Sequence, residues 1–266
     1  MIRKARDPFK SFGYFEKMVD QTIKNLEIIE LNFEKNKGSL DVKILQRKEK
    51  TYFDHYRNLL ISKYSKGDDF SKDDVKEILK KSAMYFLSYR KRGNLSLMYV
   101  LKDRKPIYYG QYVYDVYIGL IQLLSIARLI LPPNDEYFIL FHEQFKRDNV
   151  KDLLLECLVN PSANLNFEES EKAYVDIDEN FGHLKKVIQE GDKVTLLSEL
   201  KFFLENKWYQ CLKGSGYYGT HKSNEIHRGY WCFLAVAIVK IENLNDEILL
   251  GDIYYPKDLN LSHQRL

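Results

Sequence analysis

The amino-acid sequence predicts an all-α protein, built as two helical, bundle-like domains. Over most of the 266 residues, apolar side chains recur at three- and four-residue steps, which is the spacing of a helix with one buried face. Strict alternation of apolar and polar residues, the pattern of a half-buried strand, is scarce. The clearest interruption is Leu131-Pro132-Pro133-Asn134, because two successive prolines cannot continue a helix. We therefore predict one domain over 1–131 and a second over 134–266.

The first two predicted helices have recognisable ends. Asp7-Pro8 has the form of a capping aspartate followed by proline at the first helical position, and the apolar period then runs from Phe12 to Phe33. A second period runs from Tyr52 to Tyr64 and leads to Lys66-Gly67. A basic last turn followed by glycine favours the left-handed residue that commonly closes a helix. We therefore expect a helix start at Asp7-Pro8 and a helix end at Gly67.

Two further helices are expected before the prolines. Ser71-Lys72-Asp73-Asp74 resembles a capping box that opens a third helix, and this helix ends before Gly93. A fourth, buried helix is predicted from Tyr108 to Leu131. Its apolar run starts at Val116, is 16 residues long and is interrupted by polar residues, whereas a membrane span needs roughly 20 apolar residues. We therefore predict a core helix and no membrane partner.

The second half predicts four helices and one exposed segment. The helices are expected over 137–145, 150–159, 196–212 and 229–241. The last of these is apolar almost all round, which is typical of a central helix packed on every side. Asn164 to Asn180 is polar and acidic with weak periodicity, so we expect a loop or a short exposed helix there.

Composition narrows the class of protein. Hydrophobic residues make up 45% and charged residues 30% of the chain, which excludes a disordered or low-complexity protein. Cys157, Cys211 and Cys232 form no CxxC pair, so neither a disulfide framework nor a four-thiolate zinc site is encoded. No apolar segment of a signal peptide follows the basic N-terminus. We therefore predict a cytoplasmic location.

Charge is unevenly distributed along the chain. Residues 1–105 carry 25 Lys and Arg against 15 Asp and Glu, whereas residues 134–192 carry 6 against 14. The formal net charge of +3 therefore conceals a basic pole and an acidic pole. Such asymmetry predicts a charged partner for one of the poles, or complementarity between them within one chain or in a homodimer.

No catalytic or cofactor motif is spelled out. The glycines form neither GxGxxG nor GxxxxGK[ST], so no phosphate cradle and no cofactor is predicted. His221 and His227 are six residues apart, which would place them on different faces of a helix. We therefore predict no metal site there, and we expect alanine at both positions to leave the fold largely intact. We also predict that the protein is not an enzyme.

Tyrosines next to basic residues leave one alternative open. In Tyr85 to Arg92 and in Arg104 to Tyr109, aromatic rings could stack on bases while Lys and Arg hold phosphates. A nucleic-acid-binding or regulatory helical protein that uses the basic first half is therefore the alternative function. The positive charge is spread round the helices and no known nucleic-acid-binding module is spelled out, so nucleic acid is the less favoured partner.

The C-terminal residues resemble a known family. Gly229-Tyr230-Trp231-Cys232-Phe233, followed by Ala235, Ala237 and Ile241 and then by Tyr254-Tyr255-Pro256-Lys257-Asp258-Leu259, is similar to the C-terminal signature of the PoNi family. These are immunity proteins that neutralise PoNe-type polymorphic nuclease toxins. Leu234 stands where the family pattern has an acidic residue, so any polar role of that position is absent or moved. We expect Tyr254-Tyr255-Pro256 to pack back on the preceding helix.

The first half resembles the same family. Tyr56 to Gly67 is similar to a helix end of the family's N-terminal domain, and Arg6-Asp7-Pro8 and Leu123-Leu124-Ser125 fall in the expected order. The resemblance implies a PoNi-type N-terminal domain followed by a PoNi-type C-terminal domain. It also implies a role in interbacterial competition as part of a polymorphic toxin system.

The resemblance implies an immunity protein that binds a cognate secreted bacterial toxin, in the first place a DNA-cleaving nuclease, and occludes its active site. A nuclease cleft must be basic enough to hold phosphates, so we expect acidic side chains to contact it. The candidate toxin-binding residues lie in the acidic segment, in a stretch too polar to be core: Glu168, Glu169, Glu171, Asp176, Asp178 and Glu179.

Overall fold

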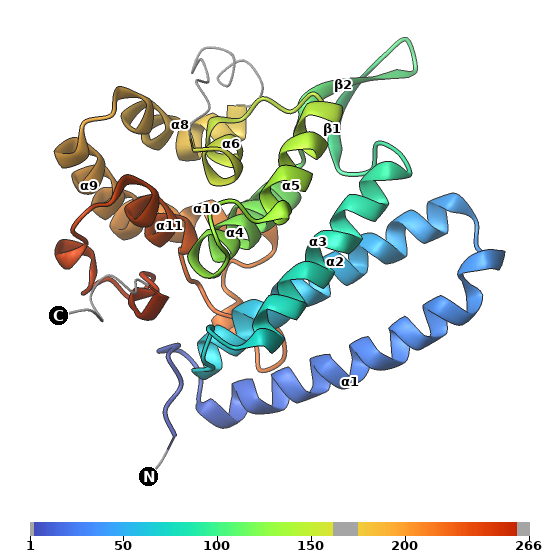
Figure 1. Cartoon of the computed structure of the whole chain (residues 1–266), viewed down its shortest axis with the longest axis horizontal. Helices are drawn as coiled ribbons and strands as arrows, with labels where there is room; N and C mark the ends of the chain where they lie inside the picture. The colour runs from blue at the N-terminus through green and yellow to red at the C-terminus, as the bar shows by residue number, and fades with distance from the viewer. Residues whose placement is uncertain (1–2, 162–174, 260–266) are drawn as a thin grey trace. The chain divides into compact units, whose positions relative to one another are not determined.

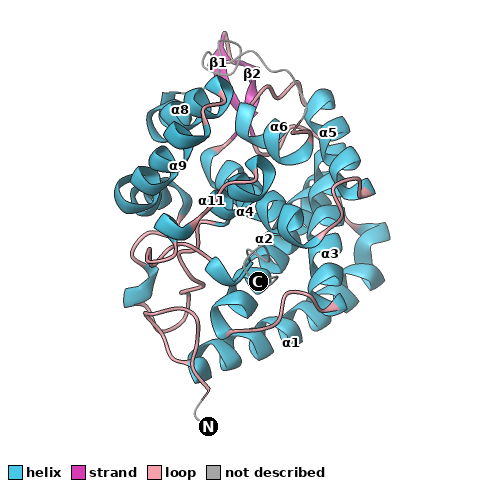
Figure 2. Cartoon of the chain, turned by 60° about the vertical axis from the view of Figure 1, so that its left-hand side comes forward, coloured by secondary structure: helices cyan, strands magenta, loops and turns pink. Residues whose placement is uncertain are grey.

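The computed structural model of the chain describes residues 3–161 and 175–259, and most of these residues are helical (Figure 1). Within these ranges, strands are confined to one two-stranded antiparallel sheet, so the all-α prediction is confirmed (Figure 2). The longer elements are α1 (Phe12–Asn36), α2 (Val42–Lys66), α3 (Asp73–Lys91), β1 (Leu97–Lys102), β2 (Lys105–Tyr112), α4 (Tyr114–Ile130), α5 (Glu136–Arg147), α6 (Leu153–Val159), α8 (Val175–Glu190), α9 (Lys193–Phe202) and α11 (Phe233–Glu242). Short elements are η1 (Lys37–Ser39), the π-helical η2 (Phe203–Trp208), α10 (Tyr209–Cys211), η3 (Leu212–Ser215), η4 (Thr220–Lys222), η5 (Glu247–Leu249) and η6 (Lys257–Leu259).

The described residues fall into two compact units. Unit 1 consists of the chain up to residue 95 together with 219–229, and unit 2 consists of 96–218 together with the chain from 230 onward. The domain boundary predicted between residues 131 and 134 lies inside unit 2. That boundary concerns which parts of the chain fold independently, and it stays a prediction.

Unit 1 is built from α1, α2 and α3, with the largest interface between α2 and α3. The start of α1 differs from the predicted one. Ser11 is the N-cap, and its hydroxyl accepts a hydrogen bond from the Tyr14 N–H at 3.2 Å. The Asp7 carboxylate instead accepts from the N–H groups of Phe9 and Lys10, so it closes a separate turn before the helix begins.

The ends of α2 and α3 show which local signals were decisive. Gly67 closes α2 in the left-handed region at φ 109°, as the sequence predicts. The predicted capping box of α3 is wrong, because the Ser71 hydroxyl bonds to Asp69 and the N-cap residue is Lys72, which makes no side-chain cap. The α3 helix ends at Lys91, before Gly93 as predicted.

Buried His227 fixes segment 219–229 within unit 1. Its ring is fully buried, with Nε2 3.1 Å from the Asp7 carboxylate and Nδ1 3.1 Å from the Thr220 hydroxyl. The segment is a 3-10 turn and a loop, so the helix-face argument applied to His221 and His227 does not hold here. We now expect His227→Ala to destabilise unit 1, because it leaves a buried carboxylate without its partner. Within the described residues, no cluster of three or more His, Cys, Asp or Glu side chains is arranged to hold a metal.

Two almost completely buried helices, α4 and α11, form the centre of unit 2. The prediction of a central helix near the C-terminal end is confirmed by α11, in which every residue from Phe233 to Val239 is buried. The α4 helix is shorter than predicted, because 105–112 forms β2 instead of a first helical turn. The β2 sequence Ile107-Tyr108-Tyr109 has high strand propensity. No helix within the described part of the chain is long and apolar enough to span a membrane.

A fully buried carboxylate connects four elements of unit 2. Asp152 is the N-cap of α6, and Lys185 of α8 forms an ion pair with it; the two side chains are 0% and 1% exposed. The carboxylate accepts from Lys185 Nζ at 2.8 Å, Gln111 Nε2 at 3.0 Å, the Tyr117 hydroxyl at 3.1 Å, and the N–H groups of Leu154 at 3.0 Å and Leu155 at 3.1 Å. Asp152 therefore positions β2, α4, α6 and α8 together.

Candidate protein-binding surface

The six acidic residues predicted to bind a toxin lie only in part within the described chain. Glu168, Glu169 and Glu171 lie outside the described residues. Asp176 and Asp178 belong to the first turns of α8, and Glu179, on the same helix, is exposed. Their contribution to a toxin interface stays a prediction.

The structure reveals a groove in unit 2 that the sequence did not predict. It lies between α9 with η2 on one side and the loop around η5 on the other, and its volume is about 340 Å³. It is lined by Lys201, Leu204, Glu205, Ile248, Leu249, Gly251, Asp252 and Ile253. The groove therefore combines aliphatic and carboxylate side chains.

The aliphatic residues of this groove divide into a floor and a rim. Leu204 and Leu249 are at most 1% exposed and form the floor. Ile248 and Ile253 form the rim and are 49% and 52% exposed, although each has a buried or half-buried neighbour in the chain. The groove thus presents two exposed isoleucines above a buried aliphatic floor.

A π-helical segment shapes one wall of the groove. After α9 ends at Phe202, the backbone of η2 continues with the wider π-helical winding up to Trp208. Trp208 is fully buried, and its Nε1 donates to the Tyr230 carbonyl at 2.7 Å, which fixes the segment against the chain before α11. π-Helical turns are rare and are found frequently at functional sites. Here the segment contributes Leu204 and Glu205 to the groove.

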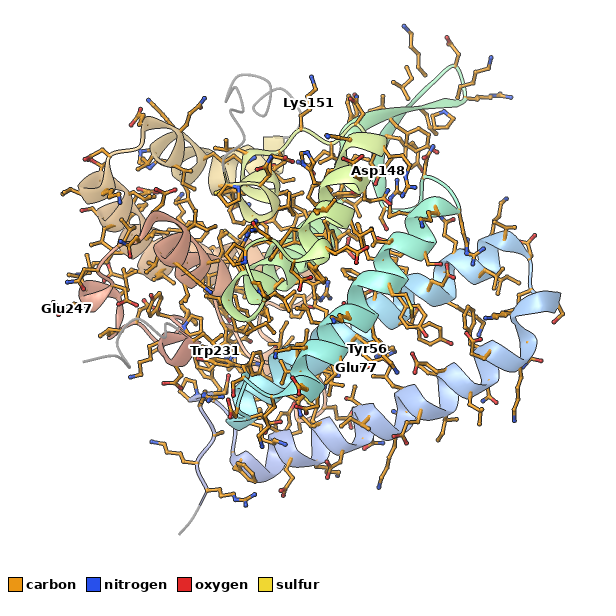
Figure 3. The ribbon with its side chains drawn as sticks, in the orientation of Figure 1. Tyr56, Glu77, Asp148, Lys151, Trp231 and Glu247 are labelled. Atoms are coloured by element: carbon orange, nitrogen blue, oxygen red, sulfur yellow. The ribbon has the colours of Figure 1, made fainter. Side chains whose placement is uncertain are left out.

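Carboxylates give the groove a negative charge. Burial raises the pKa of Asp252, and the nearby charge of Glu205 raises it further. Its Oδ1 accepts from the Tyr254 N–H at 2.7 Å, so the carboxylate is held in a fixed orientation. Glu247 precedes exposed Ile248 in η5 and lies at the outer edge of the ribbon (Figure 3). Lys201, the cation in the lining, is 4.0 Å from Glu205 and about half exposed, so it screens this charge weakly.

The loop that carries Asp252 is rigidly attached. The Tyr255 hydroxyl donates to the Asp246 carboxylate, and both side chains are buried. The Cys232 N–H donates to the Tyr254 carbonyl at 2.8 Å, which joins the loop to the start of α11. The backbone at Tyr254 is thus joined to the residue before α11, and the expectation that Tyr254-Tyr255-Pro256 packs on that helix stays a prediction. Such a preorganised loop presents its side chains without a large ordering penalty.

Basic residues of unit 1 have carboxylate partners within the same unit. Lys63 lies 2.7 Å from Asp68 and 3.0 Å from Asp74, and Lys66 lies 3.0 Å from Asp68. These pairs reduce the positive potential that a phosphate backbone would meet at the end of α2. The nucleic-acid alternative stays a prediction.

Residues 150–259 match the family model of PoNe immunity proteins (PoNi), C-terminal. The matched range contains the whole groove, and it carries 12 Lys and Arg against 18 Asp and Glu. The match supports a PoNi-type immunity protein and confirms the C-terminal part of the resemblance. The resemblance of the first half to the N-terminal domain of the family stays a prediction.

A solved structure has a similar fold. The crystal structure of protein PA2201 from Pseudomonas aeruginosa aligns with a TM-score of 0.67 over 98% of this chain and 90% of that chain, at 15% sequence identity. At this identity the likeness concerns the fold alone. Comparison with curated proteins gave no match.

The sequence contains only a weak signal for the groove. From Asp246 to Ile253 acidic and aliphatic residues alternate irregularly, and Leu249 and Ile248 are indistinguishable by hydropathy. Only the turn of η5 directs Leu249 inward and leaves Ile248 exposed. The neighbouring Glu205 comes from a distant part of the sequence, so its proximity to Asp252 has no sequence signature.

Proposed function

We propose that this protein is an immunity protein that binds a cognate secreted bacterial nuclease toxin and inhibits it by covering the active site, without catalysis of its own. The observation that carries this proposal is the match of residues 150–259 to the C-terminal domain of PoNe immunity proteins. The proposed location is the bacterial cytoplasm, where an immunity protein meets a toxin that has entered the cell. The groove of unit 2 is the proposed centre of the contact.

The groove has the chemistry that a nuclease cleft requires of an inhibitor. A nuclease holds phosphates with basic side chains, so carboxylates at Glu205, Glu247 and Asp252 can occupy positions of the nucleic-acid backbone. Ile248 and Ile253 provide apolar contact beside these charges, which excludes water from the ion pairs. The acidic residues predicted on and before α8 are proposed as further contacts for basic side chains of the toxin.

The partial burial of Asp252 supports a role in binding. Burial makes its charged form unfavourable in the free protein, which is the cause of its raised pKa. A toxin Lys or Arg placed beside Asp252 would compensate this charge. Interactions that are satisfied only in the complex contribute directly to affinity.

The test compares neutralised variants of the groove with a matched acidic control. We expect Glu205→Gln, Glu247→Gln and Asp252→Asn together to slow association with the toxin by roughly tenfold at low salt and to flatten its salt dependence. The control neutralises three exposed carboxylates of unit 1, Glu34→Gln, Asp41→Asn and Asp73→Asn, and should bind like the wild type. Association is measured by surface plasmon resonance, and protection by survival of cells that express the toxin.

The predicted acidic segment is tested in the same assays. Reversing Glu168, Glu169 and Glu171 to Lys, and separately Asp176, Asp178 and Glu179, should slow binding if this segment extends the negative surface. If the groove variant and both reversed variants bind at the wild-type rate and protect fully, the acidic surface is not the inhibitory one. If the wild type itself neither binds the toxin nor protects cells, the proposed function is wrong.

A further inference from the structure

A cluster of four tyrosines adjoins the groove of unit 2. The centroid of the Tyr209 ring lies 4.6 Å from that of Tyr218, 5.0 Å from Tyr230 and 5.9 Å from Tyr254. The Tyr230 and Tyr254 centroids are 6.4 Å apart. The rings come from α10, the segment before η4, the segment before α11 and the loop after η5. We call these four residues the tyrosine cluster.

Both walls of the groove lead into the tyrosine cluster. Glu205 lines the wall formed by η2, and Tyr209 follows it four residues later. Asp252 lines the opposite wall, and Tyr254 follows it two residues later. The rings of Tyr209 and Tyr254 are stacked, with an angle of 6° between their planes, so they join the two walls. The cluster is therefore continuous with the groove that we propose as the centre of the toxin contact.

The tyrosine cluster reaches the surface on a fixed support. Tyr218 is 41% exposed, and Tyr209 and Tyr254 are partly exposed. Tyr230 is 2% exposed, and its ring meets those of Tyr209 and Tyr254 edge to face. The Tyr230 carbonyl accepts from Trp208 Nε1 at 2.7 Å, which fixes the buried member of the cluster. Tyrosines held in this way offer a large contact area at a low cost in conformational entropy.

One end of the cluster already holds a cation. Lys213 Nζ lies 5.2 Å from the centroid of the Tyr218 ring, which is the geometry of a cation–π interaction. The other end differs. Among residues 3–161 and 175–259, no Lys or Arg lies over the ring of Tyr209 or Tyr254.

Two carboxylates lie near this second end. Asp252 Oδ1 accepts from the Tyr254 N–H at 2.7 Å, so the acid is next to the tyrosine. Glu205 acts on Asp252 from the opposite wall and, with burial, raises the pKa of Asp252. Lys201 is 4.0 Å from Glu205, whereas no Lys or Arg of the described chain forms an ion pair with Asp252. Burial raises the pKa of Tyr254, so its hydroxyl is neutral at pH 7.

We propose that Tyr209, Tyr254 and Asp252 form a receptor for one arginine side chain of the toxin, an inference that rests on the proposed immunity function. A planar guanidinium group stacks on a tyrosine face and donates two parallel N–H bonds to a carboxylate, whereas a lysine ammonium group is a point charge without a plane. A nuclease holds phosphates with basic side chains, so its cleft supplies such a group. Arginine and tyrosine are also enriched at binding hot spots.

Charge favours arginine over a nucleobase at this end of the cluster. Proteins that stack bases on aromatic rings place Lys and Arg beside the rings to hold the phosphates. Here the charged groups that act on Tyr254 and Asp252 are Asp252 itself and Glu205, which repel phosphate. Lys213 lies at the opposite end, over Tyr218. An oligonucleotide is therefore expected not to bind at Tyr254.

The first test removes the ring of Tyr254 and measures binding of the toxin's catalytic domain by surface plasmon resonance. Tyr254→Leu should weaken affinity about tenfold, mainly through faster dissociation, because a desolvated cation–π contact is lost. Tyr254→Phe keeps the ring and should weaken affinity less than about threefold. Tyr108→Leu is the matched control, since Tyr108 is 41% exposed in unit 2 and lies outside the cluster, and it should bind like the wild type.

The second test identifies the arginine. Each surface arginine of the toxin's catalytic domain is replaced by lysine, and each variant is measured against the wild-type chain and against Tyr254→Leu. We expect one Arg→Lys substitution to weaken binding to the wild type about tenfold and to have little further effect on binding to Tyr254→Leu. Should the melting temperature show that Tyr254→Leu does not fold, Asp252→Asn takes its place in this comparison.

The outcomes separate this inference from the proposed function. A wild type that does not bind the toxin refutes the proposed function itself. If the wild type binds, the inference alone is overturned by a folded Tyr254→Leu variant that dissociates at the wild-type rate, or by the absence of any arginine whose effect depends on Tyr254 or Asp252. Binding of a single-stranded oligonucleotide that is lost in Tyr254→Leu would also overturn it, because the rings would then serve nucleobases.

Discussion

Replacement of Asp152 by alanine tests the buried hub of unit 2. The substitution removes a carboxylate that is fully buried, and with it the ion pair to the ammonium group of Lys185, which is 1% exposed. Breaking a buried ion pair by removing one partner costs about 3–5 kcal/mol, because an uncompensated charge remains in the interior. For a chain of this size each kcal/mol lowers the melting temperature by roughly 2–4 °C, so we expect a decrease of about 6–20 °C.

A second substitution separates charge from packing. Lys185→Met in the Asp152→Ala background removes the buried positive charge and keeps a side chain of similar length. The double variant should therefore be more stable than Asp152→Ala alone, although the hydrogen bonds that Gln111 and Tyr117 donate to the carboxylate are lost in both. Lys186→Met, on the neighbouring and exposed position, is the surface control and should change the free energy of unfolding by less than about 0.5 kcal/mol.

The assay is thermal and urea unfolding followed by far-ultraviolet circular dichroism. The reasoning fails if Asp152→Ala destabilises the chain by less than about 1 kcal/mol, which is the ordinary loss of an N-cap. It also fails if the double variant is less stable than the single one, because the cost would then not come from the charge of Lys185.

Three further predictions concern unit 2 and its groove. Asp252→Asn should raise the melting temperature at neutral pH and weaken toxin binding. A carboxyl whose pKa is raised by folding stabilises the chain only at low pH and loses that contribution as pH rises through the raised pKa. The gain in melting temperature, measured by calorimetry, should therefore vanish near pH 3. Arg128→Lys should destabilise the chain by roughly 1–3 kcal/mol for each carbonyl it orphans at the end of α6, measured by urea unfolding, because the guanidinium donates to the carbonyls of both Leu158 and Val159; an unchanged unfolding midpoint would contradict this. Thiol reagents at pH 8 should modify the native chain far more slowly than the urea-unfolded chain. Burial raises the pKa of Cys157 to about 11 and of Cys211 to about 12, and it also raises the pKa of Cys232. Equal rates in both states would show that the thiols are accessible.

Local physics decided the parts of the fold that the sequence predicted correctly. The end of α2 at Gly67 follows from a conformation that glycine adopts without strain, and the burial of α11 follows from a helix with no polar face. Where two local signals competed, the sequence was ambiguous. Asp7-Pro8 and Ser71 both have capping chemistry, yet each was used in a turn next to the helix and not at its first residue.

The sequence by itself determined the helical class, the central helix near the C-terminal end, and the resemblance of residues 229–259 to PoNi proteins. Only the tertiary structure brought Glu205 beside Asp252, placed His227 against Asp7, and exposed Ile248 while burying Leu249. Hydrophobic periodicity indicates which face of each helix is buried, because that face is formed by residues three and four positions apart. A groove, a buried ion pair or a cluster of rings depends on residues distant in sequence, and their meeting is decided by how the finished elements pack.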